Sequence, residues 1–213
     1  MDDKLMRRYR GRVMFGPFTG VHPDELRALE GEIGRLPDDY RAFIGLANGG
    51  RLEYDIRVPP GDAGEVVGFT ELYQVGRDQR GEYGYSTLLG QCRRRKDWWL
   101  AEHISMEWLL PIAGSGGNDT LFLDLGPENT GRLVAFVQGL PRWTGLRERT
   151  VLATVADTFD EYVDALFIDD ETAQMNWEDV QHAAPDDPWR RVVEQWLDEG
   201  LTDWRARSWA TDR

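Results

Sequence analysis

The stretch HPDELRALEGEIGRLPDDYRAFIGLANGG, residues 22–50, decides how the rest of the chain is organised. Its first half has apolar residues at helical spacing after Pro23, which suits the first turn of a helix. Leu36 precedes Pro37, and a residue before proline is disfavoured in the helical conformation, so the helix breaks there. A second helix then carries an apolar stripe and ends in residues that tolerate the left-handed conformation. The stripe comprises Tyr40, Phe43, Ile44 and Ala47, and the ending comprises Asn48, Gly49 and Gly50.

The composition indicates a folded protein with room for one medium-sized domain and an appended segment. The chain has 213 residues, of which 41% are hydrophobic and nine are tryptophan. No apolar run reaches the roughly 18 residues that a membrane-spanning helix needs. The single cysteine, Cys92, excludes an intramolecular disulfide, and the first residues lack the apolar segment of a secretory signal. We therefore expect a cytoplasmic protein.

The formal net charge is −13, from 38 acidic and 25 basic residues. This charge disfavours binding to nucleic acid or to an anionic membrane, and it favours a basic protein partner. It is equally compatible with an acidic protein whose charge serves only solubility. Composition alone leaves both interpretations open.

The segment after the two helices predicts strands and a long insertion. Residues 51–58, RLEYDIRV, alternate apolar and charged side chains, as in a strand with one buried face and one wet face. Residues 66–75 predict a second strand, 76–97 a long loop or insertion, and 98–108 a helix. The wet face of the first strand would carry Glu53, Asp55 and Arg57.

No pattern in the chain is typical of a catalytic, metal or cofactor site. The run Arg93-Arg94-Arg95-Lys96 suggests a phosphate site, but the overall charge favours a solvated helix start. His103 has no second histidine or cysteine at ligand spacing, so no metal site is predicted. Cys92 lies beside basic residues that would lower its pKa, but no partner base is identifiable. We expect a protein that is not an enzyme and has no cofactor.

Two hairpins are predicted in the middle of the chain. Residues 109–125, LLPIAGSGGNDTLFLDL, indicate a strand, a glycine-rich turn and a second strand. A phosphate-binding loop is excluded because its glycines would have to open a helix. The turn GPENTG leads into Leu133–Val137, whose continuous apolar character predicts a central strand.

Asp119 and Asp124 are the one carboxylate pair that suggests hydrolytic chemistry. Residues five apart in a regular strand point to opposite faces, so a shared site would need a bulge. We interpret Asp119 as a residue that stabilises the turn.

The last third of the chain is predicted to be helical. Thr158 with Glu161 forms a capping-box pattern at the start of a helix. Residues 169–213 form an acidic extension with five tryptophans, and after Asp187 and Pro188 they show apolar residues at helical spacing. One interpretation is that this apolar stripe packs on the rest of the domain, and the other is that it binds a partner.

Three segments together resemble the SUKH superfamily, the cell-wall-regulator-like proteins that serve in bacteria largely as immunity proteins against polymorphic toxins. They are the helix–break–helix, the strand pair formed by residues 109–125 and 131–139, and DTFDEYVDALF, residues 157–167. The signature residues are Leu36, Pro37, Tyr40, Phe43, Asn48, Gly49 and Gly50. The resemblance implies an α+β domain over residues 1–168, with an insertion at about 76–105, an antiparallel-rich mixed sheet and helices packed on it.

The resemblance also implies a binding protein that neutralises a toxin domain, for example a nuclease, by covering its active surface. From the charge pattern and the expected exposure we select four candidate contacts, Glu53, Asp55, Asp119 and Trp143. The main alternative is a regulatory or scaffold module that binds an endogenous protein. A second alternative is a hydrolase that uses Asp119 or Asp124. Nothing in the sequence indicates the oligomeric state.

Overall fold

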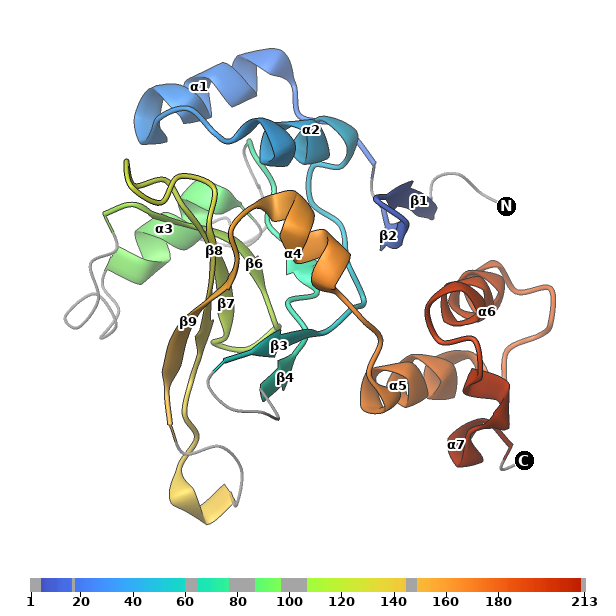
Figure 1. Ribbon diagram of the computed structural model, residues 1–213. Helices are drawn as coiled ribbons and strands as arrows, with labels where there is room; N and C mark the ends of the chain where they lie inside the picture. Colours follow the sequence, from blue (N-terminus) through green and yellow to red (C-terminus); the bar gives the residue numbers. More distant parts are fainter. Residues whose placement is uncertain are drawn as a thin grey trace.

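The computed structural model describes residues 5–16, 18–59, 65–76, 87–96, 107–144 and 149–211. It confirms the predicted α+β fold: a five-stranded antiparallel sheet, in the order β5-β6-β7-β8-β9, lies among helices (Figure 1). The strands are β1 (Met6–Tyr9), β2 (Arg12–Phe15), β3 (Ile56–Val58), β4 (Glu65–Val67), β5 (Glu71–Leu72), β6 (Leu109–Gly114), β7 (Thr120–Asp124), β8 (Leu133–Val137) and β9 (Val151–Ala156). The helices are α1 (Pro23–Ile33), α2 (Asp38–Leu46), α3 (Leu88–Lys96), α4 (Phe159–Ala165), α5 (Asp170–Val180), α6 (Pro188–Gly200) and α7 (Ser208–Thr211), with short 3-10 helices η2 (Arg142–Thr144) and η3 (Trp204–Ala206).

The signature stretch forms the two predicted helices, α1 and α2, which cross one end of the sheet (Figure 1). The end of α2 is fixed by Asn48, whose amide nitrogen donates to the Val75 carbonyl at 2.8 Å and whose amide oxygen accepts from the Val75 amide at 2.6 Å. Gly50 has a φ of 96°, and a Cβ there would lie 2.5 Å from the carbonyl oxygen of Phe15. Asn48 and Gly50 therefore hold the turn against two other segments of the chain.

The two predicted hairpins are confirmed. Residues 115–119 connect β6 to β7, and residues 125–132 connect β7 to β8. Strand β8 lies between β7 and β9 and is buried throughout, as its apolar sequence predicts. Side chains alternate between two faces, so Leu121 and Leu123 enter the main core while Phe122 joins a small cluster on the other face.

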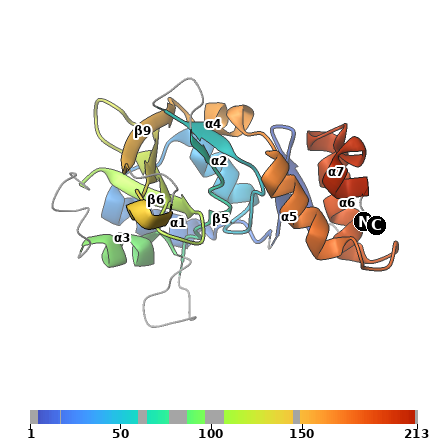
Figure 2. The same ribbon diagram turned by 90° about the horizontal axis from the view of Figure 1, so that it is seen from below.

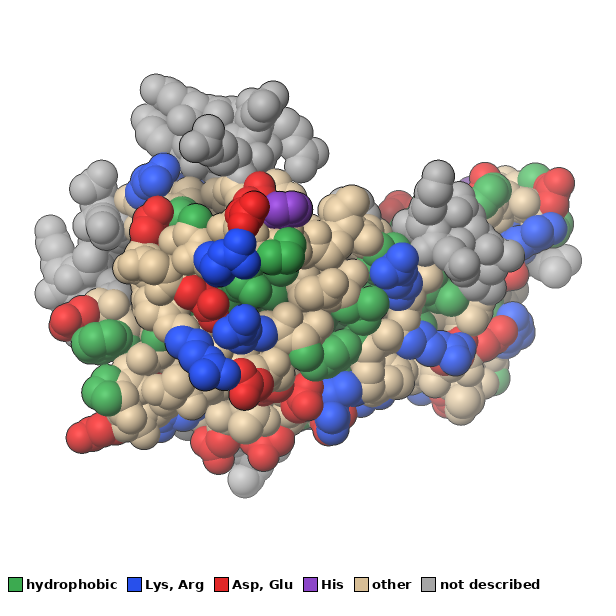
Figure 3. Space-filling model, turned by 90° about the horizontal axis from the view of Figure 1, so that it is seen from above, with side chains coloured by type: hydrophobic (Ala, Val, Ile, Leu, Met, Phe, Trp, Pro, Cys, Tyr) green, Lys and Arg blue, Asp and Glu red, His purple; other side chains and the backbone are tan. Residues whose placement is uncertain are grey.

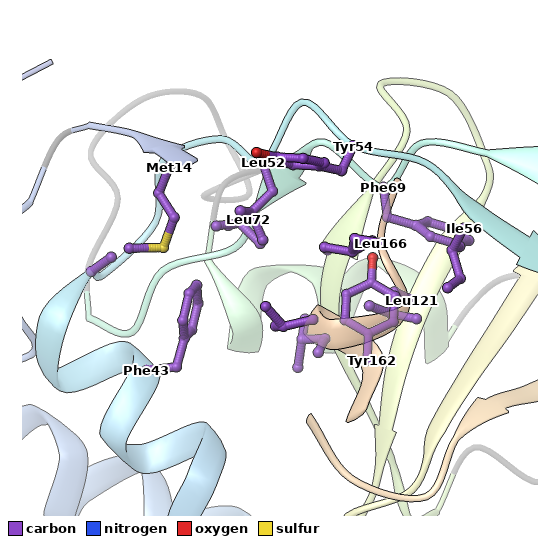
Figure 4. Close-up of a cluster of buried hydrophobic side chains, with 14 of the residues drawn as sticks. Met14, Phe43, Leu52, Tyr54, Ile56, Phe69, Leu72, Leu121, Tyr162 and Leu166 are labelled. Atoms are coloured by element: carbon purple, nitrogen blue, oxygen red, sulfur yellow. The ribbon is translucent and has the colours of Figure 1, made fainter. Parts of the chain in front are cut away.

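The main core lies between this sheet, the signature helices and α4. Phe43 meets Phe159 with ring centroids 4.7 Å apart, and Tyr40 meets Phe159 at 5.1 Å. Figure 4 shows Met14, Tyr54, Phe69 and Leu166 converging on the same interior. Asp39 connects α2 to α4, because its Oδ2 accepts from the Phe159 amide at 2.8 Å and from the Asp160 amide at 3.2 Å. These amides are unpaired within α4, so Asp39 caps a helix distant in sequence.

Three local predictions between residues 51 and 108 are corrected. Only Ile56–Val58 of the first expected strand forms a ladder, with β4, and the second expected strand divides into β4 and β5 around Gly68. The expected loop contains α3, and Arg93 to Lys96 form the last turn of that helix rather than its start. The charges of Arg93 and Arg94 in this last turn complement the helix dipole. The helix expected over 98–108 lies mostly outside the described residues, and 107–108 form a turn.

The basic segment near the N-terminus forms the hairpin β1–β2, which lies beside the C-terminal helices. Arg10 and Gly11 form its turn in left-handed conformations, with φ values of 47° and 75°. Arg10 forms ion pairs with Asp160 and Asp164 of α4, and Arg8 pairs with Glu199 of α6. The hairpin thus bridges two acidic helices.

The C-terminal helices α5, α6 and α7 lie to one side of the sheet (Figures 1 and 2). Asp187 caps α6 as predicted, with its Oδ1 accepting from the amides of Trp189 and Arg190 at 2.9 and 3.0 Å. Trp196 is fully buried, with ring centroids 6.1 Å from Tyr54 and 6.4 Å from Phe15. Apolar contact therefore joins α6 to the hairpin and to the segment before β3.

Candidate partner-binding surface

Two of the four candidate contacts, Glu53 and Asp55, are buried, so the prediction of a wet face is wrong for both. Their exposed fractions are 1% and 4%, whereas Arg57 is exposed. The reason is tertiary: Asp55 forms an isolated antiparallel bridge with Phe167, and a Cβ on Gly68 would lie only 3.1 Å from its Oδ1. Other segments of the chain therefore cover the face that was expected to be wet.

The buried pair of carboxylates has internal partners. Asp55 Oδ2 accepts from the Asp169 amide at 3.0 Å, just where α5 begins. Glu53 Oε1 lies 2.5 Å from Arg51 Nε in an ion pair, although the N–H direction does not satisfy a hydrogen bond. Burial raises the pKa of both carboxyls; the Arg51 charge opposes this for Glu53, and hydrogen bonds oppose it for Asp55. These geometries support a structural role.

Asp119 and Asp124 also accept hydrogen bonds from backbone amides. Asp119 is 8% exposed, and its Oδ1 accepts from the Gln138 amide at 2.8 Å, next to the end of β8. Asp124 Oδ1 accepts from the Gly126 amide at 2.8 Å at the opposite end of β7. The bulge in this part of the sheet falls on β6, between Pro111 and Ala113. The two carboxylates are therefore not brought together by it.

Trp143, the remaining candidate, is 86% exposed. It belongs to η2, in the connection between β8 and β9 that projects from the body of the molecule (Figure 1). An indole with so little burial contributes little to folding and has a large area available to a partner. Of the four expected contacts, Trp143 is the one that the structure leaves accessible.

A second tryptophan, Trp108, is 47% exposed in the turn before β6. It is the last residue of the helix expected over 98–108, and the sequence analysis does not select it as a surface residue. Met175 of α5 is 56% exposed. The exposure of Trp108 carries no periodic signal, because it depends on which neighbouring elements fail to cover the turn.

The negative charge is concentrated at one end of the sequence. Residues 157–213 contain 16 of the 38 acidic residues and 5 of the 25 basic ones, so they carry −11 of the net −13. By contrast, the face over α1 and α2 shows acidic and basic side chains interspersed (Figure 3). On α5, exposed residues at helical spacing form a stripe without a basic side chain, except for His182 just beyond the helix. The stripe comprises Glu171, Met175, Glu178, Asp179 and His182.

Two absences among the described residues limit the kinds of site that this part of the chain can form. No group of three or more histidine, cysteine, aspartate or glutamate side chains is arranged to hold a metal ion there. Over the same residues, no helix combines the length and the apolar character needed to cross a membrane.

Comparison with known proteins gives one family. Residues 20–165 match the model of the SMI1 / KNR4 family (SUKH-1). No significant match is found among curated proteins or among solved structures. The matched range runs from the segment before α1 to the end of α4 and contains the whole five-stranded sheet. Because the match spans more than half of the chain, the protein belongs to the SMI1 / KNR4 (SUKH-1) family.

Proposed function

We propose that this protein is an immunity-type binding protein that neutralises a cognate toxin domain by covering its active surface. The observation that carries the proposal is membership of the SUKH-1 family over residues 20–165, which is consistent with an immunity or binding module. The carboxylates that suggested hydrolysis, Asp119 and Asp124, accept hydrogen bonds from the backbone amides of Gln138 and Gly126. No catalytic role is proposed for them.

The charge distribution supports a basic toxin, such as a nuclease whose groove must hold phosphates. A net charge of −11 over residues 157–213 creates a field that attracts a basic surface before contact. Such attraction speeds encounter and weakens as salt screens it. An immunity protein benefits from rapid association, because it has to act before the toxin damages the cell.

Trp143 is the contact residue retained from the sequence-based candidates. Its indole is almost fully exposed and can be buried by a partner without disturbing the core. Replacing Trp143 with alanine is expected to weaken toxin binding by about tenfold or more while leaving the unfolding free energy nearly unchanged. Val66→Ala on β4, which lies outside the surfaces proposed to meet the toxin, is the control for loss of an exposed apolar side chain.

The experiment that tests the function uses the toxin domain that this proposal expects to be encoded immediately upstream of this chain. The full-length protein is titrated into that domain at low and at high salt, and the toxin's activity is measured in the same samples. Tight binding that abolishes activity and weakens with salt is the expected result. Absence of binding, or binding that leaves the toxin active, would contradict the proposal and favour a regulatory scaffold for an endogenous partner.

A further inference from the structure

A hollow of about 430 Å³ lies between the end of α1, the helix α3 and the strand β6. Its floor is apolar and is formed by side chains from segments far apart in sequence, including Ile33, Leu89 and Leu109. The volume is within the range of sites that bind a small ligand or a protruding side chain. Neither Trp143 nor Asp119 lines this hollow.

Three exposed charged side chains border the hollow: Glu32 of α1, Arg93 of α3 and Glu107 before β6. Within the described part of the chain, none of them forms an ion pair. Charges at a rim that are not satisfied internally are available to a partner. Two of the three are negative, which favours a positive group beside Glu32 and Glu107.

Trp108 borders the same hollow and is held in place by the backbone. Its carbonyl oxygen accepts from the Leu125 amide at 2.8 Å. A Cβ on Gly126 would lie 3.5 Å from Cβ and Cγ of Trp108, so the side chain already rests against that glycine. A half-exposed indole with a fixed position loses little conformational entropy when a partner covers it.

We propose that this hollow is a docking pocket for one apolar side chain, up to the size of an aromatic ring, from a protein partner. A basic residue next to that side chain faces Glu32 and Glu107, and Trp108 packs against the inserted group. An apolar centre bordered by a tryptophan and a charged rim is the usual composition of an interface hot spot. The proposal rests on the proposed function for the identity of the partner, the toxin domain.

The first test needs no toxin and uses Cys92, the only cysteine of the chain, which lines the hollow. The rate at which iodoacetamide alkylates Cys92 in the full-length protein is measured with three capped dipeptides: acetyl-Phe-Arg-amide, acetyl-Phe-Glu-amide and acetyl-Ala-Arg-amide. A Kd of about 1 mM would make acetyl-Phe-Arg-amide at ~4 mM slow alkylation about fivefold. The other two peptides should protect markedly less. Equal protection by all three, or by none, would overturn the pocket.

The rim is tested with a variant that leaves the apolar floor intact. Glu32→Gln combined with Glu107→Gln should remove the advantage of acetyl-Phe-Arg-amide over acetyl-Phe-Glu-amide. Glu128→Gln, an exposed glutamate in the turn after β7, is the matched control and should retain it. Retention of the preference in the double variant would show that these carboxylates do not select the basic residue.

The second test uses the toxin domain and separates the two proposals. Trp108→Ala should weaken toxin binding by about tenfold or more, with Leu152→Ala, an exposed apolar residue of β9 outside the hollow, as the control. If the toxin binds the native protein and Trp108→Ala equally well, the docking pocket is overturned and the function stands. If the toxin does not bind at all but acetyl-Phe-Arg-amide protects Cys92, the immunity function is overturned and the pocket stands as a site for another partner.

Discussion

The sheet region, up to residue 156, and the helical end, residues 157–213, use carboxylates in opposite ways. In the sheet region, several acidic residues are buried and accept backbone hydrogen bonds, as Asp55, Asp119 and Asp124 do. In the helical end most acidic residues are on the surface, where they give −11 of the net charge. A count of acidic residues therefore combines two unrelated groups. Buried carboxylates accept hydrogen bonds that join segments of the fold, whereas exposed carboxylates create the electric field that a partner meets.

The largest expected loss of stability comes from a substitution in the core of the sheet region. Phe43→Ala should lower the free energy of unfolding by about 3–5 kcal/mol, because the ring is 2% exposed and packs against Phe159 and Tyr9. Chemical denaturation followed by circular dichroism measures the loss. A loss below about 1 kcal/mol would mean that the cavity is refilled by its neighbours.

The corresponding substitution in the helical end is Trp196→Ala. Because this indole is fully buried against Phe15 and Tyr54, about 3–4 kcal/mol of stability should be lost. Tryptophan fluorescence and circular dichroism should still report one transition at the same denaturant concentration if the two regions unfold together. Two separated transitions would show that α5 to α7 form an independent unit.

The connection between the two regions is tested at Asp55. Asp55→Ala removes the acceptor of the Asp169 amide at the start of α5 and should cost about 1–3 kcal/mol. Asp55→Asn retains a carbonyl acceptor in nearly the same volume and should recover much of the loss. Equal destabilisation by both variants would indicate that the charge, not the hydrogen bond, matters.

A smaller, pH-dependent effect is expected at Glu53. Burial raises the pKa of this carboxyl above its ordinary value of 4.5, so the folded state binds the proton more tightly than the unfolded state. The protonated form is therefore the one that favours folding, and its contribution is lost as the pH rises through the raised pKa. Each unit by which the pKa is raised corresponds to about 1.4 kcal/mol.

Glu53→Gln should accordingly be more stable than the native protein at neutral pH, with the difference shrinking as the pH falls toward 4.5. Thermal unfolding of both proteins between neutral and mildly acidic pH measures this convergence. Glu128→Gln, at an exposed turn position, should show no comparable trend. A constant difference across the pH range would contradict a link to titration.

The smallest effect on stability is expected on the surface of α5. Glu178→Gln with Asp179→Asn should change the unfolding free energy by no more than about 0.5 kcal/mol. Toxin association at low salt should nevertheless slow a few-fold, because two charges of the attracting field are removed. Stopped-flow kinetics measures the rate, and the difference should vanish at high salt. An unchanged rate at low salt would assign the acidic end to solubility alone.

Much of the fold could be predicted because helix breaks, helix caps and tight turns depend on residues that are neighbours in the sequence. The break at Leu36-Pro37, the cap at Thr158 and the two hairpin turns depend on neighbouring residues, and the structure places all of them as predicted. At Thr158, the Oγ1 accepts from the Glu161 amide at 3.1 Å, while the Glu161 carboxylate reaches the amide of Asp157. The one departure from the expected capping box is that Glu161 reaches the amide of the residue just before the cap.

The candidate surface could not be read in the same way, because exposure is decided by distant segments. The alternation around Glu53 and Asp55 is compatible with a half-wet strand until Phe167 pairs with Asp55 and the start of α5 lies against it. Trp108, the last residue of the helix expected over 98–108, is instead half exposed in a turn.

The sequence by itself determined the two signature helices, the two central hairpins, the capped helices α4 and α6, and the family, since periodicity, proline breaks, turn residues and helix caps act over a few residues. Only the tertiary structure decided which carboxylates are internal and which side chains can meet a partner. It also created the hollow beside Trp108 from residues as far apart as Ile33 and Leu109. Burial is a property of contacts between distant segments, and no local pattern contains that information.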